Sequence, residues 1–215
     1  SISIVLFLSF VVAIAFTNHT LTPLRPWTAD ISIISPQNTC SIDNSILEKL
    51  EKNPIVNAAY GRMFSYDVPT TVNDDSVTLD IISYEQKQFD WAKDYLLQGS
   101  IKVVQNEVNT GLIVYSPENN IEVGDTVNCR IGEKSTEIQI AGILSDCPFN
   151  TTSNGILICS ENTFQKITGQ NKYTIIDIQL DKNATDTDVN ALHQMIGNDF
   201  TFSDERMGNE STRGI

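Results

Sequence analysis

The stretch GLIVYSPENNIEVGDTVNCRIGEKSTEIQIAGIL, residues 111–144, decides the fold of this chain. Residues 111–116, 126–131 and 135–144 read as short strands, and glycine-containing turns separate them at 121–125 and 132–134. The last strand alternates, so that Ile138 and Ile140 fall on one face, because successive side chains of a strand point to opposite faces. Short strands at this spacing, joined by glycine turns, predict a small β-barrel or sandwich.

The segments on either side of this stretch mix helices and strands. The helical spacing of Ile42, Ile46, Leu47 and Leu50 predicts a helix that Asn53-Pro54 ends. Farther along, residues 55–66 and 76–83 are predicted strands. A predicted helix then carries Phe89, Ala92 and Leu96 and ends at Gly99, and a strand follows at 101–104. After residue 158 we predict, in order, a helix, a strand, a helix and a strand, at 160–168, 173–180, 185–197 and 200–203. Thr185 and Asp188 form a capping box at the start of the second helix, and Gly197 ends it.

Each outer segment alone is too small to enclose a core, so we expect the two to share one sheet. The predicted fold class is therefore α+β. A discontinuous mixed α/β subdomain, residues 30–107 and 159–205, receives an inserted small β-barrel or sandwich subdomain, residues 108–158. A truncated transmembrane helix precedes them.

That helix is residues 1–16, SISIVLFLSFVVAIAF, which contain no charged residue, glycine or proline. A full span needs about 20 apolar residues, whereas 16 helical residues reach only about 24 Å. We therefore expect residues 1–16 to be part of a longer transmembrane helix, and the chain to be a fragment of a longer membrane protein. The alternative is a signal peptide, which has a basic start and a small-residue cleavage site. Residues 17–29 form a juxtamembrane linker with Arg25 and Trp27 as interface anchors, and residues 206–215 connect toward a next membrane helix.

The charge balance limits the classes of partner that this chain can bind. The chain has 27 acidic and 14 basic residues and a formal net charge of −13. Nucleic-acid binding requires clustered lysine and arginine, and no such cluster occurs, so we expect no nucleic-acid partner. The acidic residues are scattered along the sequence, so they indicate no specific cationic partner.

The chain has four cysteines and no C-x-x-C pair, which argues against a zinc ribbon or a thioredoxin-like site. Cys129 alternates with Val127 and Ile131 and is expected to face a core. Cys147 and Cys159 form a disulfide if the domain lies outside the cell; the alternative is that both are free buried thiols. Sequons for N-glycosylation, which matter only in a eukaryotic secreted chain, occur at Asn18, Asn150, Asn183 and Asn209.

No motif for catalysis, cofactor binding or metal binding occurs. His19 and His193 are the two histidines, and neither accompanies a nucleophile on a defined turn. The nearest carboxylate pairs are Asp74-Asp75, in a turn, and Asp186 with Asp188, at a helix start where acidic residues favour the dipole. We therefore expect no catalytic, cofactor or metal site and no enzymatic activity. Tyr66 and Phe149 are candidate partner contacts, because neither belongs to a clear apolar stripe.

Four stretches, taken in order, carry a resemblance to a known family. They are residues 1–16 leading into a mixed domain, residues 45–56, the turn IEVGDTV at 121–127 followed by IQIAGIL at 138–144, and the closing strand–helix–strand at 173–203. This arrangement resembles the extracytoplasmic domain of permeases in the FtsX/MacB-like ABC transporter family, the MacB-like periplasmic core domain. The resemblance covers nearly the whole chain.

The resemblance implies a non-catalytic domain outside the cell membrane of a bacterium. It implies a permease that forms a homodimer or heterodimer and works with a cytoplasmic ATPase subunit, whose hydrolysis of ATP it couples to export or to action on a surface partner. A peptide, a lipoprotein or a cell-wall hydrolase is the implied partner. Two alternatives stay open: a membrane-anchored enzyme of unknown type, and a single-anchor extracellular surface protein.

Overall fold

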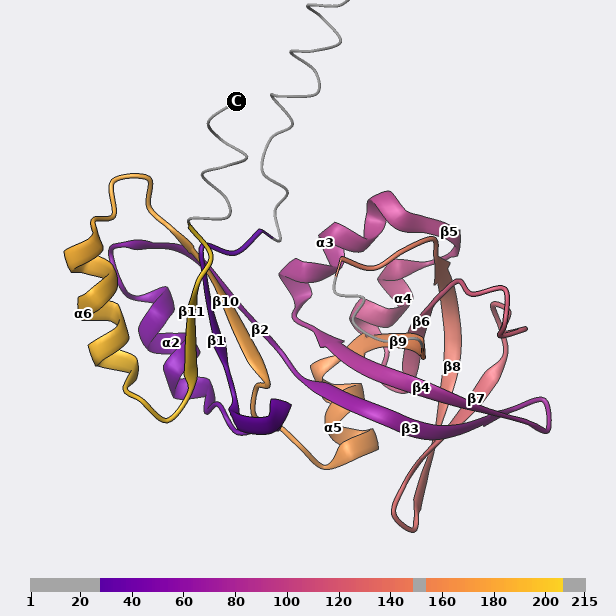
Figure 1. Cartoon of the computed structure of the whole chain (residues 1–215). Helices are drawn as coiled ribbons and strands as arrows, with labels where there is room; N and C mark the ends of the chain where they lie inside the picture. Colours follow the sequence, from indigo (N-terminus) through magenta and orange to yellow (C-terminus); the bar gives the residue numbers. More distant parts are fainter. Residues whose placement is uncertain (1–27, 149–153, 207–215) are drawn as a thin grey trace, which may run out of the picture.

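The computed structural model describes residues 28–148 and 154–206, which form two subdomains, each built on its own sheet (Figure 1). The α/β subdomain has a four-stranded antiparallel sheet in the order β11-β1-β10-β2. Its strands are β1 (Ile31–Ile34), β2 (Val56–Arg62), β10 (Ile175–Leu180) and β11 (Thr201–Asp204). Because these strands come from both ends of the described chain, the α/β subdomain is discontinuous, as predicted.

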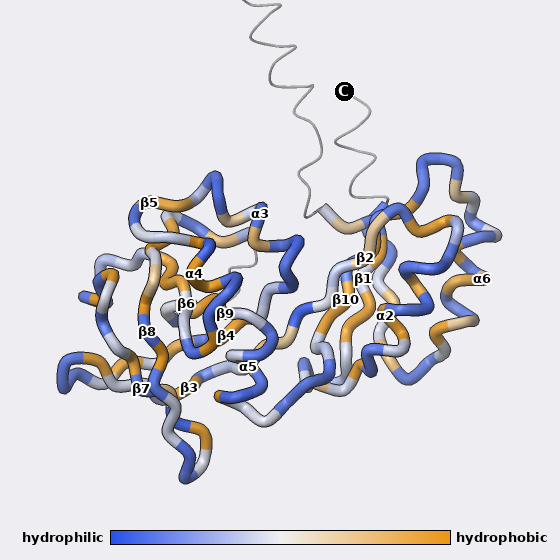
Figure 2. Tube along the Cα trace, turned by 180° about the vertical axis from the view of Figure 1, so that it is seen from behind, coloured by the Kyte–Doolittle hydropathy of each residue, from blue (hydrophilic) through white to orange (hydrophobic). Residues whose placement is uncertain are grey.

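Two helices cover one face of this sheet, α2 (Asn44–Glu51) and α6 (Asp186–Ile196) (Figure 1). The Asp43 carboxylate caps α2 by accepting from the Ser45 N–H at 3.0 Å. The predicted capping box of α6 is confirmed, since the Asp188 N–H donates to Thr185 Oγ1 and the Thr185 N–H donates to the Asp188 carboxylate. Both helices alternate hydrophobic and hydrophilic segments along the chain (Figure 2). Their buried side chains are Leu47, Leu50, Val189 and Leu192.

The barrel subdomain has a seven-stranded sheet in the order β5-β8-β6-β9-β4-β3-β7. An additional pairing of β7 with β8 closes six of these strands into a barrel and leaves β5 outside the ring, on β8. The predicted small β-barrel is therefore confirmed. Its strands are β3 (Phe64–Val72), β4 (Asp75–Tyr84), β5 (Leu96–Gly99), β6 (Thr110–Val114), β7 (Thr126–Ile131), β8 (Lys134–Leu144) and β9 (Gly155–Ser160).

Two apolar clusters stabilise the barrel. One includes Leu79, Val127, Ile138, Ile140 and Leu157 of the barrel strands and continues into the core of the α/β subdomain. The helix α5 (Glu161–Thr168) contributes Phe164 and Ile167 to the same cluster. The other cluster lies on the outside, where the short helices α3 (Phe89–Ala92) and α4 (Ile101–Asn106) pack over the strands. Three 3₁₀ turns complete the described chain: η1 (Pro36–Asn38), η2 (Gln86–Gln88) and η3 (Lys93–Tyr95).

The barrel subdomain is larger than the predicted insertion of residues 108–158. It also includes β3, β4 and β5, the helix α3 before β5, the helix α4 after β5, and α5 after β9. Residues 55–66 were predicted as one strand, but the chain leaves the α/β sheet after Arg62 and enters the barrel sheet at Phe64. Alternation assigns side chains to faces and says nothing about which sheet a strand joins, so the boundary could not be read from the pattern.

The predicted membrane helix, residues 1–16, lies outside the described residues. In residues 28–148 and 154–206, no helix has both the length and the apolar character needed to span a bilayer. Most of the linker 17–29, including His19, Arg25 and Trp27, and all of the connector 206–215 except Arg206 also lie outside the described part of the chain.

Candidate functional site

The candidate functional site is the junction where the two subdomains meet. The chain crosses between them twice: from β2 through Met63 into β3, and from α5 through residues 169–174 into β10. The first crossing is almost continuous extended chain, since only Met63 separates the two strands (Figure 1). Any relative movement of the subdomains must therefore bend these two segments.

A buried ion pair lies at the α/β side of the first crossing. Arg62, the last residue of β2, has a side chain that is 2% exposed and pairs through Nη2 with Asp177 Oδ2 on β10. The other oxygen of Asp177 accepts from the Ser32 hydroxyl of β1 at 2.7 Å. The Arg62 guanidinium also lies 6.0 Å from the ring centroid of Phe64, the first residue of β3. A buried pair whose carboxylate is satisfied on both oxygens holds its elements in one arrangement.

Backbone hydrogen bonds hold the two crossings together. The Thr174 N–H donates to the Arg62 carbonyl at 2.9 Å, and the Phe64 N–H donates to the Thr174 hydroxyl at 2.9 Å. Met63 is held on the barrel side, because its N–H donates to the Ser83 hydroxyl at 2.8 Å and its carbonyl accepts from the Ser83 N–H at 2.9 Å. The two crossings therefore form one hydrogen-bonded unit.

Gly61 allows the close approach of a tyrosine at the same place. A Cβ at Gly61 would lie 2.6 Å from the Tyr173 ring, closer than side chains pack. The Tyr173 hydroxyl donates to Glu161 Oε1 of α5 at 2.8 Å. Burial raises the pKa of Glu161, and burial with the neighbouring Glu161 carboxylate raises the pKa of the Tyr173 phenol. Tyr173 thus connects β2 of the α/β sheet to α5, which packs against the barrel core.

A second charged group lies beside this contact. Glu85, just after β4, accepts from the Gly61 N–H at 2.5 Å and pairs with Lys87 at 3.2 Å. Lys87 also pairs with Glu51 of α2 at 3.0 Å and donates to the Ala59 carbonyl at 2.7 Å. Burial raises the pKa of the Glu85 carboxyl, while the Gly61 and Lys87 hydrogen bonds act in the opposite direction. Apart from the Glu85–Lys87 pair, these contacts join the barrel side to the α/β subdomain, so the junction is rich in specific polar contacts.

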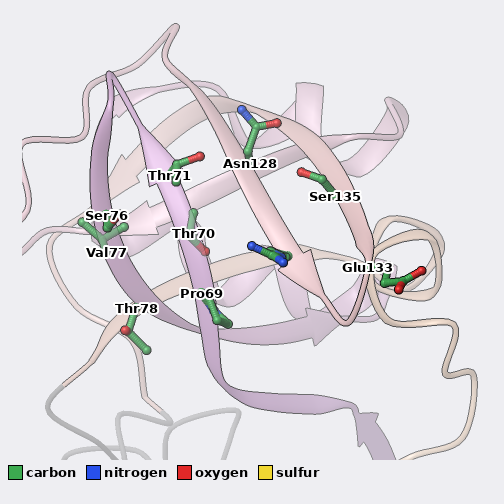
Figure 3. A pocket seen from close by; sticks show the side chains of 10 residues that line it. Pro69, Thr70, Thr71, Ser76, Val77, Thr78, Asn128, Glu133 and Ser135 are labelled. Carbon is green, nitrogen blue, oxygen red and sulfur yellow. The ribbon is translucent and has the colours of Figure 1, made fainter.

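A polar hollow of about 600 Å³ lies on the barrel, where β3 and β7 diverge (Figure 3). The two strands pair only through Thr70 with Cys129 and Thr71 with Asn128. Most of the lining side chains carry hydroxyl, amide or charged groups: Thr70, Thr71, Ser76, Thr78, Asn128, Arg130, Glu133 and Ser135. The hollow can therefore hydrogen-bond a polar partner.

The structure places Cys147 and Cys159 apart. All four cysteines are free thiols. Cys159 points to the interior of the barrel, with Leu157 two residues before it on β9, whereas Cys147 packs outside the barrel with Ile156 and Ile158. The two thiols thus lie on opposite faces of β9, and Cys147 contacts the Tyr84 hydroxyl at 3.6 Å. The expectation that Cys129 faces a core is confirmed.

The other residues selected from the sequence have structural contacts. The His193 ring stacks on Phe202 of β11, with centroids 4.2 Å apart. Tyr66 is half-buried and stacks on Phe64 at 5.8 Å. Asp186 pairs with Arg206 at 3.0 Å. Asn183 is described and exposed, and Asp74 lies in the β3–β4 turn at a φ of 67°. Phe149 and the sequons at Asn18, Asn150 and Asn209 lie outside the described residues.

Sequence reasoning missed the junction. Asp177 stands between Ile176 and Ile178 in an apolar strand, which is the signal of a buried carboxylate that needs a partner. The partner, Arg62, is 115 residues away in sequence, so no local pattern connects the two. Among the described residues, no group of three or more histidine, cysteine, aspartate or glutamate side chains is arranged to hold a metal ion.

Comparison with solved structures identifies the fold. The periplasmic region of MacB from Actinobacillus actinomycetemcomitans matches with a TM-score of 0.64 and 16% sequence identity, over 91% of this chain and 98% of that one. The extracellular domain of the ABC-type transporter YknZ from Gram-positive bacteria matches with a TM-score of 0.53 and 10% identity, over 76% of this chain and 87% of that one. No protein-family model and no curated protein matches the sequence. The chain therefore has the fold of a MacB-like periplasmic domain, as its sequence motifs indicated.

Proposed function

We propose that this chain is the extracytoplasmic domain of a bacterial ABC transporter permease, without catalytic activity of its own. In this role it couples ATP hydrolysis by a cytoplasmic subunit to work outside the cell membrane. The similar solved structures are extracytoplasmic regions of such transporters, which supports this general kind of role.

The observation that carries the proposal is the pairing of the first and last described strands. Ile31 at the start of β1 pairs with Asp204 at the end of β11, and the Glu205 N–H donates to the Asp30 carbonyl at 2.8 Å. The chain therefore enters and leaves the α/β sheet side by side. Two neighbouring membrane helices, one before and one after the domain, would need this geometry.

The junction supports the coupling part of the proposal. Within the sheet, a displacement that begins at β1 and β11 passes to β10 and β2, and both of these strands adjoin the crossings to the barrel. In the proposed complex, two permease copies, identical or not, carry this movement to export a peptide or lipoprotein or to act on a cell-wall hydrolase.

The test uses the full-length protein in its native membrane. We expect an affinity-tagged chain, purified in detergent, to bring with it a nucleotide-binding subunit and vanadate-sensitive ATP hydrolysis. We also expect protease added to intact spheroplasts to digest the domain. A protein that purifies without any ATPase would favour the single-anchor surface protein or the membrane-anchored enzyme and would refute the transporter role.

A variant separates coupling from assembly. Arg62→Met with Asp177→Leu removes the buried pair without leaving a lone buried charge, so the ATPase should still co-purify while the transport phenotype is lost. Lys102→Met, a substitution of an exposed lysine on helix α4 of the barrel subdomain, is the matched control and should keep both. Full transport by the double variant would refute the role of the junction.

A further inference from the structure

The strand β5 is the open edge of the barrel sheet. It pairs with β8 through Leu96 with Leu144, Gln98 with Ile143 and Gly99 with Gly142, and no strand of the described chain pairs with its other side. A closed barrel has no edges, so β5 is the place where this sheet offers backbone groups to another chain. Extended peptides bind such edges by adding a strand.

An open hollow of about 590 Å³ lies beside β5. Two of its lining side chains, Leu97 and Tyr115, are 61% and 60% exposed, the highest values among the large apolar residues of the described chain. Ile121 and Ile143, both buried, also line it. Single exposed apolar residues are ordinary on protein surfaces, but two on one hollow, at a sheet edge, mark a binding surface. Figure 2 colours part of β5 as hydrophobic.

The surroundings of this hollow are acidic. Its lining includes Glu122 and no lysine, arginine or histidine. An adjoining hollow of about 290 Å³ shares Asn119 and Asn120 with it, adds Asp75 and Glu118, and also has no basic residue in its lining. All three carboxylates are exposed. Since the whole chain carries a formal net charge of −13, the potential here attracts cations.

The acidic rim is held in place before any partner arrives. The Asp125 carboxylate accepts from the Glu122 N–H at 2.9 Å and from the Asn73 amide at 3.4 Å. The Gly124 N–H donates to the Ile140 carbonyl at 2.8 Å, which fixes the turn on β8. A surface that is ordered in advance loses less conformational entropy when it binds.

We propose that the β5 edge and the hollow beside it bind an extended peptide that carries both aliphatic and basic side chains. The peptide backbone pairs with β5. Its aliphatic side chains contact Leu97 and Tyr115, and its lysine or arginine side chains lie near Glu118 and Glu122. This inference rests on the proposed function in one respect: the peptide must meet the barrel outside the cell.

The experiment measures fluorescence anisotropy of labelled peptides with the full chain in detergent micelles. The probe is the peptide KVKVKVK, and the two comparison peptides are EVEVEVE and KSKSKSK. We expect both comparison peptides to bind about tenfold or more weakly, which corresponds to about 1.4 kcal/mol. Binding of KVKVKVK should weaken as sodium chloride shortens the screening length. Equal binding of the acidic peptide, or no binding of KVKVKVK, would overturn the proposal.

Paired variants locate the site. Leu97→Ser with Tyr115→Ser should weaken binding of KVKVKVK about tenfold, whereas Val108→Ser with Met195→Ser, at the other two exposed large apolar residues, should leave it unchanged. Glu118→Gln with Glu122→Gln should also weaken it. Equal effects of the site and control variants would place the peptide elsewhere and overturn the proposal.

Hydrogen exchange tests the strand addition, because the amides of β5 should become protected when KVKVKVK is added. Unchanged exchange at residues 96–99 would refute pairing with β5. These results are independent of the ATPase test. A chain that binds the peptide but purifies without an ATPase would refute the transporter role alone, and a chain with an ATPase but no peptide binding would refute this inference alone.

Discussion

Substitution of Arg62 by methionine should destabilise the chain strongly. The change removes the guanidinium. The Asp177 carboxylate, 10% exposed, then keeps the hydrogen bond from the Ser32 hydroxyl and loses its charged partner. Breaking a buried pair by removing one partner costs about 3–5 kcal/mol. Because the Ser32 hydrogen bond remains, we expect a loss near the lower value, about 3 kcal/mol. For a domain of this size, that lowers the melting temperature by about 6–12 °C.

The assay is urea denaturation of four proteins: wild type, Arg62→Met, Asp177→Leu and the double variant. The double variant buries no uncompensated charge, so it should be more stable than Arg62→Met by about 1–2 kcal/mol, although the Ser32 hydroxyl loses its acceptor. Lys102→Met should change stability by less than about 0.5 kcal/mol, as exposed substitutions do.

Two results would refute the reasoning. One is a loss below about 1 kcal/mol for Arg62→Met, which is the value of an exposed ion pair. The other is additivity, in which the double variant loses the sum of the two single losses, because residues in contact should show a coupling energy.

Three further predictions concern a carboxyl, a turn and the thiols. Since burial raises the pKa of Glu161, the folded chain holds this proton to a higher pH than the unfolded chain, so the stability that it contributes falls as pH rises through the raised pKa. Between about pH 4 and about pH 7, the melting temperature of Glu161→Gln should therefore fall less than that of the wild type. The same pH profile in both proteins would contradict this. Gly124→Ala, at a φ of 97°, should lower the free energy of unfolding by about 1–2 kcal/mol in urea denaturation, and a neutral result would contradict it. Burial raises the pKa of Cys129 to about 11, so it should resist alkylation at pH 8 in the folded chain. Unfolding without reductant should expose four thiols, whereas a Cys147–Cys159 disulfide would leave two.

The sequence predicted the barrel strands because their pattern is local. Alternation through residues 126–144 and the glycine turns correspond to β7 and β8, and the Thr185–Asp188 capping box marks the start of α6. Residues 96–104 were predicted in the wrong order, as a helix end followed by a strand. The structure has the strand β5 first and the helix α4 after it. Apolar runs of four residues fit either a strand or a helix. Here residues 96–99 form a strand because they pair with the free edge of β8.

Neither the junction nor the hollow beside β5 could be predicted in the same way. The β5 surface combines residues of β5, the loop after β6 and β8, which closure of the barrel brings together. The acidic residues looked scattered because their clustering exists only in the folded chain. The separation of Cys147 and Cys159 could not be predicted for a related reason: the two lie twelve positions apart in sequence, but which face of β9 each thiol occupies depends on the barrel.

Three polar side chains form a row across the α/β sheet, and this row supports the coupling role that we propose for the junction. Ser32 on β1, Asp177 on β10 and Arg62 on β2 are joined in sequence by one hydrogen bond and one ion pair. The row therefore starts on the strand where the chain enters the sheet and ends one residue before Met63, where the chain leaves for the barrel. An apolar row of the same length would allow the strands to slide more easily, because dispersion contacts have little directional preference, whereas a buried ion pair has one favourable geometry. In the proposed coupling role, these charges would make the three strands move together, and the barrel would follow because β2 and β3 form nearly continuous extended chain.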